Sequence, residues 1–376
     1  MNIPFKTHDM HLNLKNTLKL ILTYLLFTVI WLAPQTDLHA QSFESNVDSL
    51  LNEIFEPNGP GAVFLVAKDG EPVYRKAYGK ANLELNVDMT PNNVFQIGSM
   101  TKQFTAVGIL ILEEEGKLSL QDDIRAYISD FPVQGDSLTI RHLLNHTSGI
   151  KDFTKMKTIM QIARKDLSPK ELIDFFKDEP VEFSPGEKFE YNNSGYVVLG
   201  YVIEQVSGMS YENFIEEKVF DKVGMADSRY ASDRELVKKR AYGYHDRGGY
   251  TNKMWVSLNI PYASGSLMST VDDMLIWQNA LNSEELLSHE TLQKAFTPGT
   301  LANGENTTYG FGWHLKEWDG EPVREHGGSI FGFKSMGVYL PDQDIYVVGF
   351  SNCDCNSPTV VSREIAKIAL SELSDN

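Results

Sequence analysis

Residues 97–106 read IGSMTKQFTA and begin an apolar segment that continues to Gly116. Apolar residues recur at helical spacing and also fill most of the remaining faces, so we expect a helix over residues 99–115 that is buried in the centre of the protein. Ser99 and Lys102 lie three positions apart at its start and therefore share one face. A lysine on a buried helix is costly unless it is paired, and this one needs a reason to be there.

Catalysis is one such reason. A lysine amine beside a serine hydroxyl helps to generate a nucleophile, and the start of a helix stabilises developing negative charge. The alternative is structural: Ser99 caps the helix, and Lys102 is a surface residue one turn later. The expected burial of Lys102 favours the catalytic interpretation.

A second segment with candidate site residues is FEYNNSG, residues 189–195. A nearby ammonium lowers the pKa of a phenol, so Tyr191 is a candidate general base for Ser99 and a later acid for the leaving group. Asn193 is placed to contact the substrate or Lys102. The alternative is a turn that precedes a helix, because the segment is rich in turn residues.

A third segment is EHGGSIF, residues 325–331. His326 is followed by two glycines, which allow close approach to the backbone, and a strand edge offers N–H groups to an oxyanion. The structural alternative is a hairpin corner.

The N-terminal residues 1–40 have the pattern of a secretory signal peptide. Three lysines precede a fourteen-residue apolar run, and Ala40 is a small residue before Gln41. The run is shorter than the roughly 20 residues that span a bilayer. We therefore expect an exported protein, periplasmic or extracellular, without a stable membrane span once the leader is removed. An uncleaved N-terminal anchor is the alternative.

The remaining chain divides into two expected lobes. Two strands joined at Asp69-Gly70 precede the central helix, and further strands and a final amphipathic helix end the chain. The middle is mainly helical in pattern. We expect an α/β lobe from residues 41–121 and 305–376, and a mainly helical lobe over residues 122–304.

Composition and spacing argue against several classes of function. The net charge of −17 and the absence of a basic stripe argue against nucleic acid as a partner. His142 and His146 are four apart, but no glutamate follows His142 and no third ligand is near, so we expect no metal site. Cys353 and Cys355 would share one strand face with awkward disulfide geometry, and we interpret them as structurally incidental.

The three segments, in this order, resemble the serine β-lactamase and penicillin-binding-protein superfamily, in the branch of class C β-lactamases, D-alanyl-D-alanine carboxypeptidases and related esterases. The family pattern S-x-x-K, Y-x-N and K-T-G or H-x-G reads here SMTK, YNN and HGG. The similarity covers roughly residues 45–371. It implies an α/β fold plus an all-α lobe, with an antiparallel sheet flanked by helices from both termini and a cleft between the lobes.

The resemblance also implies roles for individual residues. Ser99 would be the acylated nucleophile, Lys102 its proton partner and Tyr191 the general base and acid. Substrate contacts would come from Asn193, His326 and Gly328, and the oxyanion hole from the N–H groups of Ser99 and Ser329. No metal or organic cofactor is implied.

The resemblance leaves the substrate open. His326 and Gly327 stand where β-lactamases carry lysine and threonine, which weakens the case for efficient β-lactam hydrolysis. The expected function is cleavage of an amide or ester, in a D-amino-acid peptide, a peptidoglycan fragment or a small ester. The alternatives are a carboxylesterase, a β-lactamase, or a non-catalytic penicillin-binding or sensor-like domain.

Overall fold

The computed structural model describes residues 1, 4, 42–132, 137–355 and 357–374. The predicted signal peptide, apart from residues 1 and 4, lies outside the described residues. Within the described part of the chain, no helix combines the length and the hydropathy needed to cross a membrane.

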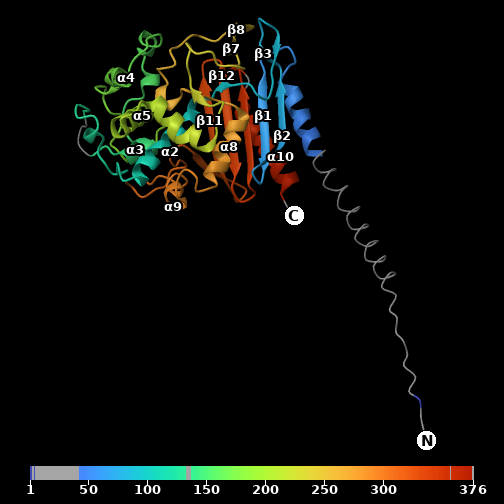
Figure 1. Ribbon diagram of the computed structural model, residues 1–376. Coiled ribbons are helices and arrows are strands. Elements are labelled where there is room, and N and C mark those ends of the chain that lie inside the picture. The colour runs from blue at the N-terminus through green and yellow to red at the C-terminus, as the bar shows by residue number, and fades with distance from the viewer. Residues whose placement is uncertain (2–3, 5–41, 133–136, 356, 375–376) are drawn as a thin grey trace.

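An antiparallel sheet of six strands forms one side of the molecule (Figure 1). Its order is β10-β11-β12-β13-β1-β2, so the two ends of the chain meet where β13 pairs with β1. The strands are β1 (Ala62–Lys68), β2 (Glu71–Tyr78), β10 (His314–Trp318), β11 (Glu321–Ile330), β12 (Phe333–Leu340) and β13 (Ile345–Ser351). The predicted turn at Asp69-Gly70 joins β1 to β2 and is confirmed.

Both faces of the sheet are buried at its central strands β1, β12 and β13. On β1, Phe64 and Val66 face a helix over residues 42–54 and α10 (Pro358–Leu373), in a core that also contains Ile365. The alternate residues Val63 and Leu65 belong to the larger core on the opposite face. This alternation is the two-residue period of a strand, and it explains why β1 is apolar throughout.

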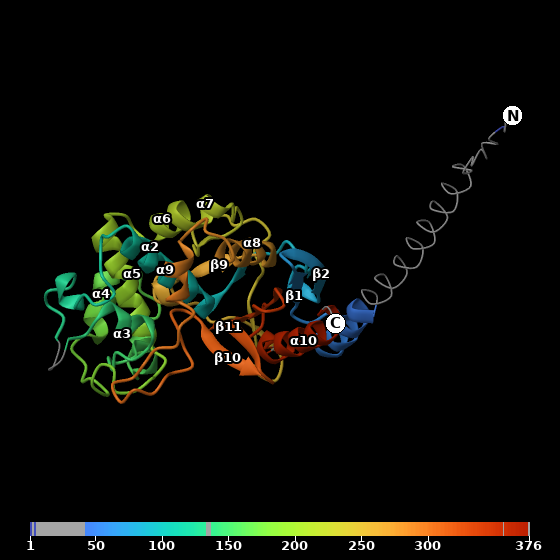
Figure 2. The same cartoon turned by 90° about the horizontal axis from the view of Figure 1, so that it is seen from below.

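Helices form the other side of the molecule, as the two views show (Figures 1 and 2). Helix α2 (Thr101–Glu114) packs against α5 (Asn193–Ser207), which also contacts α3 (Ile140–Leu144), α4 (Pro169–Phe176) and α6 (Tyr211–Ile215). Every residue of α2 from position 101 to 112 is buried, which confirms the predicted central helix. The remaining helices are α7 (Asp221–Val223), α8 (Val271–Leu281) and α9 (His289–Gln293).

Seven shorter strands of the described chain form three small sheets outside the six-stranded sheet. A small sheet has the order β5-β9-β6, and two hairpins pair β3 with β4 and β7 with β8. Their bounds are β3 (Lys80–Asn82), β4 (Val87–Asp88), β5 (Phe95–Gln96), β6 (Arg229–Tyr230), β7 (Tyr244–Asp246), β8 (Tyr250–Asn252) and β9 (Leu267–Ser269). The middle of the chain therefore contains strands as well as helices. The predicted fold class, an antiparallel sheet flanked by helices from both termini with a helical lobe, is confirmed.

The prediction that Cys353 and Cys355 are structurally incidental is wrong. A disulfide joins Cys353 and Cys355, whose Cα atoms are 5.1 Å apart. Strand β13 ends at Ser351, so the cysteines lie in a turn rather than on one face of a strand. The turn brings the two side chains together where a strand would hold them apart.

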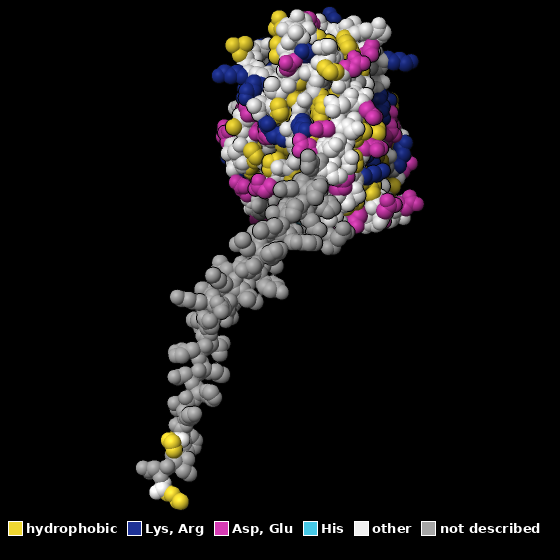
Figure 3. Space-filling model, turned by 90° about the vertical axis from the view of Figure 1, so that its right-hand side faces the viewer, with side chains coloured by type: hydrophobic (Ala, Val, Ile, Leu, Met, Phe, Trp, Pro, Cys, Tyr) yellow, Lys and Arg dark blue, Asp and Glu magenta, His cyan; other side chains and the backbone are white. Residues whose placement is uncertain are grey.

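The surface that carries α10 and the helix over residues 42–54 shows no segregation of charge. Figure 3 shows acidic and basic side chains interspersed across this face. The net acidity of the chain is therefore not concentrated in one patch here.

Candidate active site

Ser99 lies in a short 3₁₀ turn, η1 (Gly98–Met100), directly before α2. No side chain caps either helical segment, so the structural alternative for Ser99, a helix-capping serine, is not what the structure shows. Gly98 has φ +51°, and a Cβ there would lie 2.9 Å from the backbone nitrogen of Ser329. A glycine at this position therefore allows β11 to run directly beside the candidate nucleophile.

Lys102 has no exposed surface and directs its amine at the site. Its Nζ donates to Ser99 Oγ at 3.2 Å, to Asn193 Oδ1 at 2.9 Å and to the Ser264 carbonyl at 2.9 Å. Burial lowers the pKa of Lys102 to about 7, against the opposing charge of Asp152. A lysine with this pKa is partly neutral near pH 7 and can accept a proton from Ser99.

Asp152 is a site residue that the sequence reasoning missed. It is 1% exposed and accepts hydrogen bonds from the Thr154 amide at 2.9 Å and from Asn193 Nδ2 at 3.3 Å. The amide of Asn193 thus links Asp152 to Lys102. Asp152 lies in a loop before the short turn η3 (Phe153–Lys155), and no spacing to another motif marks it.

Tyr191 packs against the amine of Lys102, whose Nζ is 4.8 Å from the centre of the phenol ring. Burial raises the pKa of Tyr191, and the nearby Ser99 hydroxyl offsets only part of this increase. The prediction of a lowered pKa is therefore wrong, because Lys102 is itself partly neutral and desolvation of the phenol dominates. Tyr191 is poised to donate a proton, and Lys102 is the better base.

Strand β11 forms the opposite wall of the site. A Cβ on Gly328 would lie 2.0 Å from the Ile97 carbonyl oxygen, so this glycine allows β11 to contact the chain just before Ser99. Strand β10 pairs only with residues 321–325 of β11, which leaves the later residues of β11 at an edge beside η1. The N–H groups of Ser99 and Ser329 are therefore available candidates for an oxyanion hole.

His326 is buried in this strand, close to Tyr191. It is 2% exposed, and its Nδ1 lies 2.7 Å from the Gly327 carbonyl oxygen, so Nδ1 carries the proton and donates. Its Nε2 then accepts from the Tyr309 hydroxyl at 3.0 Å. Burial lowers the pKa of His326 well below the ordinary histidine value. His326 and Gly328 are not among the described residues that line the cavity, and the ring centre of His326 is 6.1 Å from that of Tyr191. Their substrate contacts stay a prediction.

His146 belongs to the same buried aromatic cluster. Its Nδ1 accepts from the Asn192 amide at 3.1 Å, and its ring centre is 4.3 Å from that of Tyr191. By its spacing, His142 is a possible metal ligand together with His146. Its Nδ1 instead accepts a hydrogen bond from the Thr139 amide at the start of α3. No group of three potential metal ligands occurs in the part of the chain that the structure describes.

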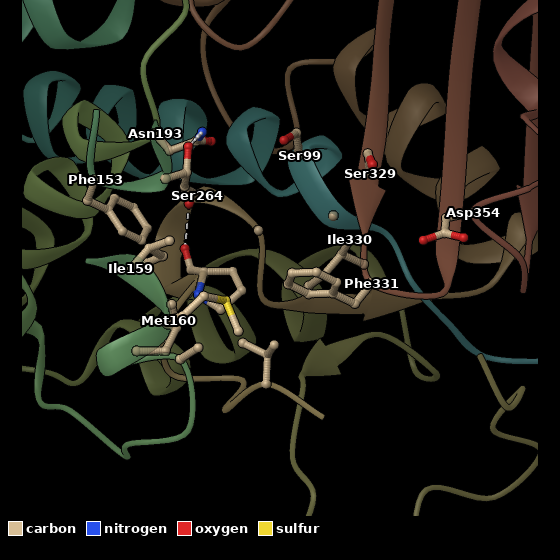
Figure 4. A pocket seen from close by; sticks show the side chains of 17 residues that line it. Ser99, Phe153, Ile159, Met160, Asn193, Ser264, Ser329, Ile330, Phe331 and Asp354 are labelled. Atoms are coloured by element: carbon tan, nitrogen blue, oxygen red, sulfur yellow. Dashed lines mark hydrogen bonds between the residues drawn. The ribbon is translucent and has the colours of Figure 1, made fainter. Parts of the chain in front are cut away.

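A cavity of about 400 Å³ opens beside Ser99 (Figure 4). Its polar lining comes from Ser99, Thr154, Asn193, Ser264, Ser329 and Asp354. Most of the rest of the lining is apolar: Phe153, Ile159, Met160, Ala163, Val256, Ile260, Pro261, Ile330 and Phe331. The described lining contains no lysine, arginine or histidine, although Lys334, which is not in the lining, donates to Ser329 Oγ at 2.8 Å.

Comparison with known proteins gives consistent matches. Residues 44–370 match the family described as Beta-lactamase. The chain is 31% identical to penicillin-binding protein 4* of Bacillus subtilis, over 83% of this chain and 72% of that protein. It is 26% identical to a D-aminopeptidase of Gluconobacter oxydans, over 83% of this chain and 59% of that protein.

A solved structure shares the fold at similar identity. The octameric penicillin-binding protein homologue from Pyrococcus abyssi aligns with a TM-score of 0.76 and 30% identity. The alignment covers 89% of this chain and 78% of that one.

Proposed function

The chain belongs to the beta-lactamase family, and from this premise we propose that it is a serine hydrolase that forms an acyl-enzyme at Ser99. The family includes hydrolases such as the D-aminopeptidase relative. One observation carries the proposal: a fully buried lysine with a pKa of about 7 donates a hydrogen bond to the hydroxyl of Ser99. A merely structural lysine would find its partners at the surface.

Acylation follows from this geometry. Neutral Lys102 accepts the hydroxyl proton while Ser99 Oγ bonds to the substrate carbonyl carbon, and the N–H groups of Ser99 and Ser329 stabilise the oxyanion. The bond to the leaving group then breaks, and Tyr191 donates a proton to that group and regains one from Lys102. Attack of water on the acyl-enzyme releases the acid and restores Ser99.

The substrates we propose are amides or esters: a D-amino-acid peptide, a cell-wall fragment or a small ester. The absence of a cation from the described cavity lining speaks against β-lactams, which carry a carboxylate. Rates on nitrophenyl esters, a D-Ala-D-Ala peptide and nitrocefin separate the activities, and we expect nitrocefin to be the poorest. A non-catalytic penicillin-binding domain would give one equivalent of product and then stop.

Labelling with a fluorescent fluorophosphonate tests the nucleophile directly. We expect Ser99→Ala to abolish labelling and Ser283→Ala, an exposed serine outside the cavity lining, to retain it. Undiminished labelling of Ser99→Ala would refute the assignment.

We further propose that the protein is exported to the periplasm or the cell exterior, on the basis of residues 1–40. The N-terminal sequence of the protein recovered from cells tests this. We expect it to begin near Gln41.

A further inference from the structure

We propose that Asp354 forms a cation-binding subsite of the active-site cavity, so that the substrate carries an amine on one side of the scissile carbonyl and an apolar group on the other. This proposal rests on the serine hydrolase function above and narrows its substrate class.

Asp354 is the only charged residue among the described residues that line the cavity. Its side chain is 31% exposed. One carboxylate oxygen, Oδ2, lies 2.5 Å from Nδ1 of His245, and Oδ1 has no hydrogen-bond partner among the described residues. One oxygen is thus held by the protein, while the other is available to a ligand.

The hydrogen bonds of His245 leave the negative charge of Asp354 uncompensated. Nε2 of His245 accepts from the Met254 amide at 2.9 Å, so this nitrogen carries no proton. Nδ1 is then the protonated nitrogen, and it donates to Asp354. A histidine in this arrangement is neutral, and His245 therefore orients the carboxylate without cancelling its charge.

The backbone of Asp354 is also fixed. The disulfide between Cys353 and Cys355 joins the two residues that flank it, and its amide donates to the Tyr244 carbonyl at 3.3 Å. A carboxylate held in this way loses little conformational freedom when it binds a cation.

The cavity has a different chemistry on the other side of Ser99. Figure 4 shows Phe153, Ile159 and Met160 on one side of Ser99, and Ser329 and then Asp354 on the other, with the apolar side chains of Ile330 and Phe331 below them in this view. A ligand that fills both parts places an apolar group against the first set and an amine against Asp354. The carbonyl between them then faces the nucleophile.

Lys334 lies close to the cavity and would favour a negatively charged ligand instead. Its Nζ donates to Ser329 Oγ at 2.8 Å, although Lys334 is not part of the cavity lining. If Lys334 controlled the specificity, the cavity would prefer a carboxylate. The two possibilities predict opposite charge preferences.

Three ligands of matched shape distinguish them: 4-phenylbutylamine, 4-phenylbutanol and 4-phenylbutanoate, titrated by calorimetry at pH 7.5 into the wild-type protein. We expect the ammonium to bind about tenfold more tightly than the alcohol, which is the usual strength of a partly exposed charge-assisted hydrogen bond. Equal binding of all three, or a preference for the carboxylate, would overturn the proposal without the need for any variant.

Two variants test whether Asp354 is the source of the ammonium preference. We expect Asp354→Asn to remove the ammonium preference and Glu317→Gln, an exposed residue on β10, to retain it. A preference that persists in Asp354→Asn would also overturn the proposal.

Catalysis is measured in parallel, as kcat/KM for butyrylcholine against its uncharged isostere 3,3-dimethylbutyl butyrate, and for 6-aminohexanoyl against hexanoyl nitrophenyl esters. We expect the cationic member of one pair to be favoured, and Asp354→Asn to abolish that preference. Absence of all hydrolysis and of Ser99 labelling would refute the hydrolase function alone, because the ammonium preference in binding would still support the subsite.

Discussion

The phenolic oxygen of Tyr309 lies 3.0 Å from Nε2 of His326, and both residues are buried. The hydrogen bond from the Tyr309 hydroxyl keeps His326 neutral, with Nε2 as an unprotonated acceptor. His326 therefore does not play the part of a substrate-binding cation, even though it stands in the third motif.

Tyr309→Phe should separate stability from catalysis. The variant leaves Nε2 of His326 without its donor, so we expect the free energy of unfolding to fall by about 1–3 kcal/mol. Because neither Tyr309 nor His326 is among the described residues that line the cavity, kcat/KM at 25 °C should change by less than about threefold. Urea denaturation and steady-state rates measure the two effects, and a large loss of rate with unchanged stability would contradict this placement of His326.

The activity should rise with pH through the pKa of Lys102. The base acts in its neutral form, which is scarce below pH 6 and predominant above pH 8 if the pKa is about 7. We expect log kcat/KM to increase over this range and then level off. Lys102→Met should lose about 100-fold or more of the rate, together with this pH dependence. A flat profile for the wild-type protein would exclude Lys102 as the proton acceptor.

Asp152→Asn should move that profile. The negative charge of Asp152 raises the pKa of Lys102 against the effect of burial, so its removal lowers the pKa further. We expect the midpoint of the pH profile to shift to lower pH. Asp178→Asn, an exposed control in the same lobe, should leave the midpoint where it is. A shift of the midpoint to higher pH would contradict the conclusion that the charge of Asp152 raises the pKa of Lys102.

Two adjacent glycines of β11 should differ sharply in their tolerance of alanine. A Cβ on Gly328 would clash with the Ile97 carbonyl oxygen and with Ser335 Oγ at 2.2 Å, whereas a Cβ on Gly327 has its nearest neighbour, Met336 Sδ, at 3.3 Å. We expect Gly328→Ala to lower stability by about 1–3 kcal/mol and Ser99 labelling by at least tenfold. Gly327→Ala should retain most of both. Thermal melting and the rates of Ser99 labelling measure the two effects. Equal losses in Gly327→Ala and Gly328→Ala would contradict this prediction.

The sequence by itself determined the features that depend on local spacing. The apolar pattern after Ser99 predicted α2, and the three-residue spacing placed Lys102 beside Ser99, because the geometry of one helix sets both. The turn at Asp69-Gly70 was predictable for the same reason. The order of the three motifs then indicated the family and, with it, the fold.

Tertiary structure decided the chemistry of the site. Asp152, Asn193 and Lys102 come from different segments, and only packing shows that they share one network. Burial, which no local pattern measures, sets the direction of the pKa shifts of Lys102, Tyr191 and His326. The turn after β13 joins the two cysteines and places Asp354 in the cavity. These properties depend on contacts between segments distant in the chain, and such contacts exist only in the folded protein.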